Sequence, residues 1–480
     1  MGPRLKSSLC RMDDMVFIYV LTLKMYKKLH KISIYYHWIM REKLETYNFN
    51  RKKMALFKHY PKVNLLNQIN NSKAKFYKHF NTETKVILGI ETSCDDTGCG
   101  IVDTQGNLLG ESLHSQHQIH LNNGGIIPPL AADLHRENVD RVVQGALKKA
   151  RLNVEDIDAI ATTVKPGLPM SLKIGTKYGK YLCQKYNKPF IPIHHMEAHA
   201  LTARMIDKSI QFPFLVLLIS GGHCLLAVAQ NVDKFLLLGD SIDDAPGEAF
   251  DKLARRMKLK NLPEYATLSG GQAIELAASK ATNPLQFEFK PPMSAYKDCT
   301  FSFAGIKNIC TRYIIKEEIF KDLAPDEVIP DVNNLCAGFL LVITRHLCHR
   351  LQRAIEYAAR KQLIPTDKQT LVVSGGVGCN NFIAEGLEIV CSELGYRLVR
   401  PPPKLCTDNG IMIAWNGVER WNANLGIYKD FDNIDIQKSC PLGTRLVEEV
   451  AKENISCKWV KLSQLNKPQS EWYSLKSSIS

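Results

Sequence analysis

The sequence predicts an α/β protein in which two lobes, each a mixed sheet with helices, surround a nucleotide-binding cleft. A strand–turn–strand pattern in the first part of the chain returns later in the same order. Each copy is followed by apolar residues at helical spacing. The length of 480 residues leaves room for two packed lobes, and the 45% hydrophobic share is that of an ordinary globular protein.

The first copy is a three-stranded meander with a helix after it. Short polar turns that contain glycine separate its apolar runs, as in strands that pair with their neighbours along the chain. The three runs and the helical pattern cover residues 86–91, 99–103, 108–115 and 130–151.

The second copy has three apolar runs in the same order, again followed by a helical pattern, and later strand–helix alternations extend both halves. Two such halves form the two-lobed plan of actin, heat-shock ATPases and sugar kinases. Two unrelated α/β domains with similar hairpins are the alternative, but three parallel features favour a duplication. The second runs and helix cover residues 214–220, 224–230, 235–239 and 247–257.

The net charge of +14 belongs to the N-terminal segment. Residues 1–84 contain 17 Lys and Arg against 5 Asp and Glu, a net of +12, so the rest of the chain carries only +2. The charge therefore does not by itself predict a nucleic-acid-binding body. From Met54 onward the segment is basic and poor in acids, which favours an organellar transit peptide over the alternative of a disordered basic tail, although it lacks arginine there.

Cysteine usage and hydropathy indicate a reducing compartment and no membrane association. The fourteen cysteines include no Cys-x-x-Cys pair, and several lie in apolar runs, which suits buried thiols better than disulfides. The longest apolar stretch, residues 15–23, is about half the length that a membrane span needs.

His195 and His199 are the first candidate metal ligands. They follow an apolar run that predicts a strand entering a helix, and on a helix two residues four apart share one face. A zinc protease would need a glutamate directly after the first histidine, whereas Glu197 is two positions on. Two structural histidines on a helix remain the alternative.

Asp408 is the third candidate ligand, just before a predicted helix at residues 411–420. An aspartate there usually only caps the helix. Together with two imidazoles, its carboxylate would leave open positions for a substrate, and both Zn and Fe suit such a set.

Two glycine-rich turns are candidate nucleotide contacts. Ser220, Gly221 and Gly222 follow a buried strand, so their backbone N–H groups can approach a phosphate. The turn at residues 374–380 suits a close-packed purine or ribose, with Asn380 free to hydrogen-bond. The chain has no Gly-Lys-Ser/Thr run, which excludes a P-loop.

Residues 243–252 are rich in carboxylates at the start of a helix. Asp243 and Asp244 are expected to cap that helix, whereas Asp251, one turn further, could bind ribose hydroxyls. Gly271 opens the next predicted helix and could admit a sugar ring. Several cations are either solvated or contacts to a polyanion: Arg255, Arg256, Lys258 and Lys307.

These motifs together resemble the universal threonylcarbamoyl transferase family, in its bacterial and mitochondrial branch. The matching pieces run in the family's order over about residues 86–420, although Cys379 and the spacing before Gly271 depart from the usual pattern. The pieces are residues 91–97, 125–138, 166–172, 194–199, 220–223, 242–252, 301–307, 375–380 and 406–410.

The resemblance implies transfer of a threonylcarbamoyl group from threonylcarbamoyl-AMP to the adenosine 3′ of the anticodon, in tRNAs that read codons beginning with A. It implies one divalent metal, Zn or Fe, held by His195, His199 and Asp408, which would also be the catalytic residues. The intermediate would be bound by Asp408 and by a further set: Leu218, Ile219, Ser220, Gly221, Gly222, Asp251, Gly271 and Asn380.

The expected partners are tRNA, a separate enzyme that makes threonylcarbamoyl-AMP, and a second copy in a homodimer, all in the mitochondrial matrix. An actin-like ATPase or sugar kinase is the alternative function, and a metallopeptidase is a weaker one. The expected domains are a leader (1–84), a first lobe (85–210), a second lobe (211–405), a helix returning to the first lobe (406–425) and a C-terminal extension (426–480).

Overall fold

A computed structural model describes residues 84–467 of the chain. The chain divides into two units, Met1–Ser72 and Lys73–Ser480, and the described residues all belong to the second. Nearly all of the basic leader predicted for residues 1–84 therefore lies outside the described residues.

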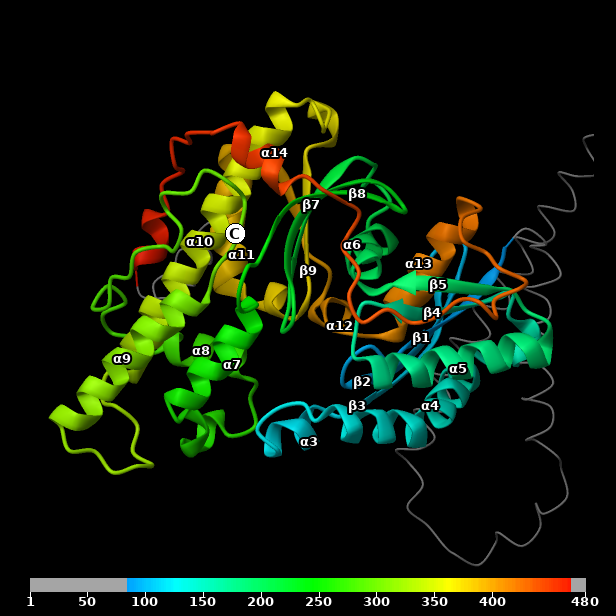
Figure 1. Ribbon diagram of the computed structural model, residues 1–480, viewed down its shortest axis with the longest axis horizontal. Helices are drawn as coiled ribbons and strands as arrows, with labels where there is room; N and C mark the ends of the chain where they lie inside the picture. Colours follow the sequence, from blue (N-terminus) through cyan, green and yellow to red (C-terminus); the bar gives the residue numbers. More distant parts are fainter. Residues whose placement is uncertain (1–83, 468–480) are drawn as a thin grey trace, which may run out of the picture. The chain divides into compact units, whose positions relative to one another are not determined.

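The described part contains two mixed sheets (Figure 1). In the first, the order is β3-β2-β1-β4-β5; β1, β2 and β3 are antiparallel neighbours, while β4 and β5 continue parallel to β1. The strands are β1 (Val86–Glu91), β2 (Asp96–Asp103), β3 (Leu108–Ser115), β4 (Ala159–Lys165) and β5 (Phe190–His194).

The second sheet repeats this order. Strand β6 corresponds to β1 of the first sheet. Strands β7 and β8 form the antiparallel meander with β6, while β9 and β10 continue parallel to β6 on its other side, and β11 is added beyond β8. The predicted duplication and actin-like two-lobed plan are thus confirmed. The strands are β6 (Phe214–Ile219), β7 (Cys224–Asn231), β8 (Lys234–Asp240), β9 (Thr370–Ser374), β10 (Arg397–Val399) and β11 (Thr444–Arg445).

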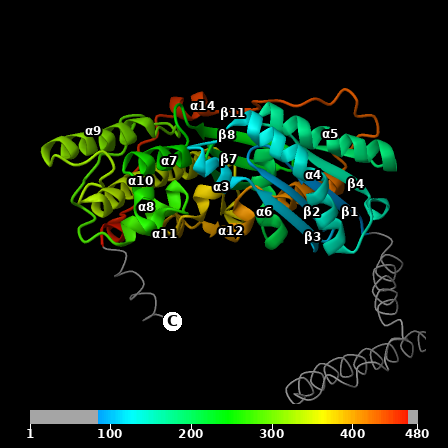
Figure 2. The same cartoon turned by 90° about the horizontal axis from the view of Figure 1, so that it is seen from below.

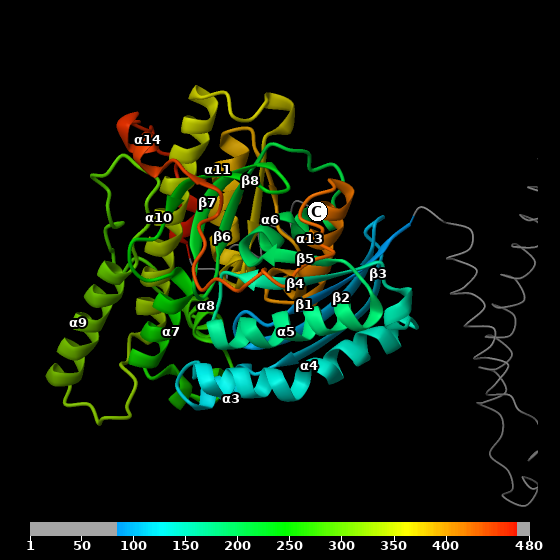
Figure 3. The ribbon, with the colours of Figure 1, turned by 45° about the vertical axis from the view of Figure 1, so that its right-hand side comes forward.

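Helices cover both sheets. Two long helices, α4 and α5, lie side by side on one face of the first sheet, and α10 and α11 pack together beside the second (Figures 1 and 3). The helices are α3 (His117–Asn122), α4 (Pro128–Ala150), α5 (Pro169–Tyr186), α6 (His195–Ile206), α7 (Pro246–Arg256), α8 (Gly270–Ser279), α9 (Ala304–Phe320), α10 (Val332–Arg360), α11 (Asn381–Glu393), α12 (Pro403–Cys406), α13 (Gly410–Asn422) and α14 (Val447–Lys452).

Helix α13 lies directly against the first sheet because glycines in the strands leave room for its backbone. A Cβ added to Gly98 would lie 2.6 Å from the backbone nitrogen of Gly410, and one added to Gly100 would lie 2.5 Å from that of Ile411. Side chains longer than hydrogen would therefore push the helix away. This contact fixes the start of α13, where Asp408 lies.

Helix α6 packs beside α13 (Figure 3). The indole N–H of Trp415 donates a 2.9 Å hydrogen bond to the carbonyl of Leu201, which ties the two helices together. Their apolar faces share one buried cluster with strands of both sheets, including Ile193, Val216 and Val372. The two candidate ligand segments, one at the start of each helix, are thereby held in fixed relation.

The apolar stretch at residues 15–23 lies outside the described residues. Among residues 84–467, none of the helices has the length and apolar content required to cross a lipid bilayer.

Candidate metal centre and nucleotide turns

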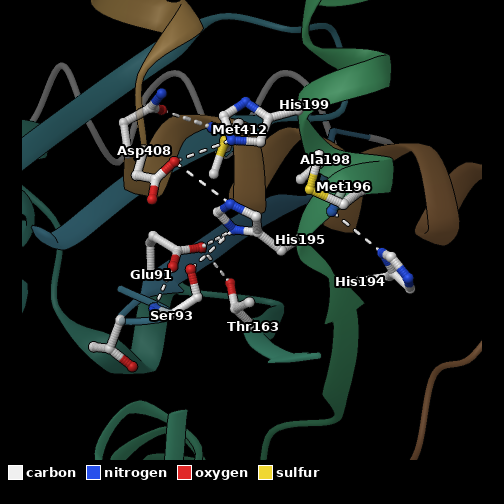
Figure 4. A network of polar contacts seen from close by, with 12 residues as sticks. Glu91, Ser93, Thr163, His194, His195, Met196, Ala198, His199, Asp408 and Met412 are labelled. Carbon is white, nitrogen blue, oxygen red and sulfur yellow. Dashed lines mark hydrogen bonds and ion pairs between the residues drawn. The ribbon is translucent and has the colours of Figure 1, made fainter. Parts of the chain in front are cut away.

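The two histidines lie at the start of α6. Strand β5 ends at His194 and the helix begins at His195, so His195 and His199 occupy successive turns of one face. Their rings meet edge to face with centroids 4.7 Å apart, and both residues are buried. The Nε2 atoms of His195 and His199 lie 3.4 Å and 3.1 Å from the Oδ1 atom of Asp408 (Figure 4).

Asp408 is not the cap of the helix that follows it. Asn409 has that role, because its Oδ1 atom accepts a 2.9 Å hydrogen bond from the backbone N–H of Met412. The carboxylate of Asp408 faces the histidines instead. The alternative that Asp408 only caps a helix is therefore wrong.

The three side chains fit a transition-metal ion. One ligand atom from each lies within 4.8 Å of the others. Ligands about 2.0–2.1 Å from a tetrahedral zinc stand roughly 3.3 Å apart, close to the 3.4 Å and 3.1 Å that separate the two histidine Nε2 atoms from Asp408. Two imidazoles and one carboxylate suit Zn or Fe and leave positions free for a substrate.

Glu91 supports His195 from the side opposite Asp408 (Figure 4). It ends β1, is fully buried, and its Oε2 atom lies 3.2 Å from Nδ1 of His195. The hydroxyl of Thr163 donates to Oε2 at 2.6 Å, and the backbone N–H of Ser93 donates to Oε1 at 2.5 Å. A carboxylate that accepts the Nδ1 proton fixes the tautomer in which Nε2 is a free metal ligand.

The charges in this cluster act on one another. Burial alone would lower the pKa of His195, but the carboxylates of Asp408 and Glu91 raise it to about 10. Burial would raise the pKa of Asp408, yet His195 and His199 hold it well below its usual range. His195 thus lies between two carboxylates, which favour a positive charge on it. The same negative surroundings suit a divalent cation bound to its ring.

Glu197 points away from the centre. Its carboxylate forms a 2.5 Å ion pair with Arg420 of α13, and both side chains are nearly buried. The carboxylate is thus committed to holding two helices together, as expected if it is not a protease base.

His223 is a further residue near the centre that the sequence prediction missed. It ends the turn between β6 and β7, and burial, with the positive charge of His195 and His199 as a lesser cause, lowers its pKa to about 4. His223 is therefore neutral at physiological pH. Its position directly after the Ser-Gly-Gly turn is the signal that could have found it.

The Ser-Gly-Gly turn is open to solvent at its glycines. Leu218 and Ile219 are buried in β6, so only their backbone atoms can face a ligand. The hydroxyl of Ser220 accepts hydrogen bonds from the backbone N–H groups of Gly222 and His223, at 3.4 Å and 3.1 Å. Ser220 therefore shapes the turn.

Asp251 and the glycine pair lie together. The backbone N–H of Gly270 donates a 3.0 Å hydrogen bond to the Oδ1 atom of Asp251, and a Cβ on Gly270 would lie 2.6 Å from the Cα atom of Asp251. A Cβ on Gly271 would meet nothing within 4 Å. Gly270 is thus required for packing, while Gly271 faces open space where a ligand can lie.

Asn380 caps α11. Its Oδ1 atom accepts a 3.0 Å hydrogen bond from the N–H of Ile383, so of its two polar side-chain atoms only the nitrogen is left for the predicted contact to a ligand. Next to it, the N–H of Asn381 donates a 2.7 Å hydrogen bond to Glu275 of α8, the helix that begins with the glycine pair.

The candidate nucleotide contacts come together around β6. A Cβ on Gly247, at the start of α7, would lie 2.7 Å from the Cα atom of Gly221, so α7 adjoins the Ser-Gly-Gly turn. A Cβ on Gly375 would lie 2.3 Å from the carbonyl oxygen of Ile219, and Gly375 has φ +97°, a conformation that favours glycine. The two glycine-rich turns and the start of α7 therefore adjoin one another at the end of β6, and Asp251 of α7 contacts the glycine pair that begins α8.

The aspartates before α7 do not cap it, contrary to expectation. Asp243 instead accepts from the hydroxyl of Ser302 at 2.6 Å and the N–H of Phe303 at 2.8 Å, at the start of α9. Asp244 pairs with Lys252 and with Lys307, so Lys307 is not solvated.

The other cations of this region are also engaged. Arg256 and Lys258 both pair with Glu318, at 2.5 Å and 2.7 Å. Arg255 donates a 2.7 Å hydrogen bond to the carbonyl of Gly124, in the loop after α3, near α7 in Figure 2. If Arg255, Arg256 and Lys258 contact a polyanion, as one of the two expectations has it, they must first break these ion pairs and this hydrogen bond.

Comparison with known proteins identifies close relatives. A family model described as "TsaD: tRNA N6-adenosine threonylcarbamoyltransferase" matches residues 107–415. The mouse protein named mitochondrial tRNA N6-adenosine threonylcarbamoyltransferase is 49% identical over 379 residues, which are 79% of this chain and 91% of the mouse protein. The human protein of the same name is 48% identical over 378 residues, again 79% of this chain and 91% of its own length.

Likeness to solved structures is more distant. Component A of (R)-2-hydroxyglutaryl-CoA dehydratase from Acidaminococcus fermentans covers 71% of this chain and 99% of its own, with 16% identity and a TM-score of 0.41.

Proposed function

The chain belongs to the family of tRNA N6-adenosine threonylcarbamoyltransferases, and we propose from this premise what its centre does. The enzyme is a transferase that modifies tRNA. We propose that it moves the threonylcarbamoyl group of threonylcarbamoyl-AMP to the N6 amine of the adenosine 3′ of the anticodon, in tRNAs that read codons beginning with A. The observation that carries this assignment is the convergence of the ligand atoms of His195, His199 and Asp408.

The donor would be held by the turns around β6. The backbone at Gly221 and Gly222 is open and follows a buried strand, so its N–H groups can approach the phosphate of the AMP portion. Asp251 is positioned by Gly270 and can accept hydrogen bonds from ribose hydroxyls, while the open face of Gly271 admits the sugar. Asn380 would contribute its side-chain NH₂ group, because its oxygen caps α11.

His195, His199 and Asp408 would hold one divalent ion, Zn or Fe. When bound, this ion supplies a Lewis acid that polarises the carbamoyl carbonyl. Glu91 and the hydroxyl of Ser93 lie 3.2 Å and 3.1 Å from Nδ1 of His195, and a proton held there would leave Nε2 free for the ion.

In the transfer, the adenine N6 atom forms a bond to the carbamoyl carbon, the bond from that carbon to the phosphate oxygen breaks, AMP leaves, and one proton passes from N6 to solvent. A purine amine is a weak nucleophile, so positioning supplies much of the acceleration. We propose that His223, which follows the Ser-Gly-Gly turn and is kept neutral by burial, accepts a hydrogen bond from the incoming amine. Ser220 is held by its own turn and takes no covalent part.

Two other activities fit the residues less well. A metallopeptidase needs a free carboxylate next to the ion, whereas Glu197 is bound to Arg420. An actin-like ATPase or sugar kinase would leave the histidine pair structural and would give no reason for Asp408 to converge on it.

The proposed location is the mitochondrial matrix, in keeping with the names of the mouse and human relatives and with the basic N-terminal segment. We propose that a separate enzyme makes threonylcarbamoyl-AMP and that the chain acts as a homodimer.

The function is tested by depleting the protein and analysing mitochondrial tRNA nucleosides by mass spectrometry. The threonylcarbamoyl modification should disappear and return with the wild-type chain but not with His195→Ala. Persistence of the modification after complete depletion would show that the assignment is wrong.

A further inference from the structure

A turn of the first lobe is hydrogen-bonded to the second lobe beside the proposed donor site. The turn follows α3, which comes between β3 and α4 in the first lobe and lies near α7 (Figure 2). The guanidinium of Arg255 donates a 2.7 Å hydrogen bond to the backbone carbonyl of Gly124. The Nζ atom of Lys260 donates a 3.0 Å hydrogen bond to the backbone carbonyl of Leu121. Both donors belong to the second lobe, one to α7 and the other to the 3-10 turn η2 (Leu259–Asn261).

The base of this segment is fixed to the first lobe. Gln116 and His120 are buried, and Nε2 of His120 lies 2.9 Å from Oε1 of Gln116. The side-chain nitrogen of Gln116 donates a 3.3 Å hydrogen bond to the carbonyl of Ala131 in α4, and its backbone N–H donates a 3.1 Å bond to the carbonyl of Asp95. These bonds hold the base of the segment whether or not its tip is bound to the second lobe.

The tip of the turn has little packing of its own. Gly124 and Gly125 have φ values of +77° and +150°, and a Cβ added to either would meet nothing within 4 Å. Ile126 and Ile127, which follow, are each 41% exposed. Apolar contacts therefore contribute little to holding the tip. Because hydrogen bonds from charged donors are stronger than those from neutral ones, the two cationic side chains are the contacts expected to hold it.

Neighbouring cations of the same region have partners of a different kind. Arg256 and Lys258 pair with Glu318 of α9, inside the second lobe. Arg255 and Lys260 instead donate to backbone carbonyls of the first lobe. The ion pairs of the first two residues therefore stabilise one lobe, whereas the bonds of the other two join the lobes.

The bridged turn lies on the side of α7 that carries Asp251. Asp251 and Arg255 are four residues apart on α7, so their side chains share one face of the helix. Burial raises the pKa of Asp251, and the positive charges of Arg255 and Lys260 are among the effects that oppose this rise. Both cations therefore act on the carboxylate that is proposed to bind the ribose of the donor.

We propose that Arg255 and Lys260 are positioning residues that hold the turn at residues 121–125 as a wall of the donor site, supplied by the first lobe. With both hydrogen bonds formed, the wall encloses the ribose side of the site next to Asp251. With both broken, the tip of the turn can swing away on its glycines, so that the donor can enter and AMP can leave. The identity of the enclosed ligand rests on the proposed function.

The first test measures hydrogen–deuterium exchange along the full, zinc-loaded chain without nucleotide. The backbone N–H groups of Asn123 and Gly125 donate hydrogen bonds within the segment, so their exchange reports opening of the turn. Exchange at residues 121–127 should be at least about tenfold faster in the Arg255→Ala/Lys260→Ala double variant than in wild type. Equal exchange in the double variant and wild type would overturn the proposal.

Two controls accompany the double variant. Lys280→Ala removes a cation that pairs with Glu264 inside the second lobe, and the turn should exchange in it as in wild type. Arg255→Lys/Lys260→Arg keeps both cationic donors and should restore slow exchange. Melting temperatures verify that each variant is folded. Equally fast exchange of the turn in Lys280→Ala and in the double alanine variant would overturn the assignment to the bonds between the lobes.

A second readout links the wall to the donor, with AMP as the probe for binding. The dissociation constant of AMP and KM for threonylcarbamoyl-AMP should each rise at least about fivefold in the double alanine variant, while kcat and zinc affinity stay within about twofold of wild type. An unchanged KM would overturn the role in donor binding. If the wild-type chain neither binds AMP nor modifies tRNA, the proposed function fails, and exchange in the nucleotide-free chain still decides whether the two cations hold the turn.

Discussion

Replacing Glu91 by glutamine tests whether this buried carboxylate positions a metal ligand. All three neighbours of Glu91 use it as an acceptor: Ser93 at Oε1, and Thr163 and His195 at Oε2. A glutamine must present its NH₂ group at one of these places. An NH₂ group at the Oε1 position would face another donor, the N–H of Ser93. An NH₂ group at the Oε2 position would donate to Nδ1 of His195. The proton of His195 would then sit on Nε2, which could not bind an ion.

Either orientation costs binding free energy. Loss of a carboxylate behind a ligating histidine typically weakens metal binding 10- to 100-fold, or about 1.4–2.7 kcal/mol. The dissociation constant for zinc is measured by competition with a chromophoric chelator, and the spectrum of the cobalt-loaded protein reports the coordination. Glu197→Gln is the matched control, because it removes a buried carboxylate from α6 that faces Arg420 instead of the centre. Zinc affinity of Glu91→Gln within threefold of wild type, in a folded variant, would refute the positioning role.

Three further predictions follow from packing and charge. Gly270→Ala should lower the free energy of unfolding by about 1–3 kcal/mol, because the added Cβ would overlap Asp251. Gly271→Ala should leave stability unchanged and raise KM for the donor. Equal melting temperatures for the two variants would contradict this prediction. Gly89→Ala should give little folded protein in a circular dichroism melt, since its Cβ would lie 2.6 Å from the carbonyl oxygen of α13's first residue; a wild-type melt would show that α13 can shift. Burial raises the pKa of Asp96 to about 7, so the native state keeps a proton that the unfolded chain loses near pH 4. In the presence of a chelator, the stability of the protein should therefore fall as the pH rises from about 4 to 7. Asp96→Asn should remove that part of the pH dependence in urea titrations, and an unchanged slope would argue against it.

The duplicated fold was predictable because its signal is local. Apolar runs separated by glycine-containing turns marked β1 and β3 at their observed bounds. Strand β2 was predicted to begin at Cys99 but begins at Asp96, since residues 96–98 pair with β3 despite their polar character. A search for apolar periodicity does not detect polar residues whose backbone groups hydrogen-bond to a neighbouring strand.

The metal centre was only partly predictable. The three proposed ligands were predicted from the four-residue spacing of His195 and His199 and from the motif before α13 that contains Asp408. Glu91 and His223 were missed as parts of the centre because their closeness to His195 depends on strands far away in sequence. A charged residue that closes an otherwise apolar strand, as Glu91 does, is the signal that such a buried carboxylate leaves.

The most direct test of the proposed centre is transfer in a purified system. The zinc- or iron-loaded chain is mixed with threonylcarbamoyl-AMP and an unmodified tRNA that reads a codon beginning with A, and the nucleosides are analysed by mass spectrometry. We predict threonylcarbamoyladenosine at the position 3′ of the anticodon, formed at least about 100-fold more slowly by a folded Asp408→Ala variant. An equal rate with Asp408→Ala, or no product with the metal-loaded wild-type chain, would contradict the proposed centre.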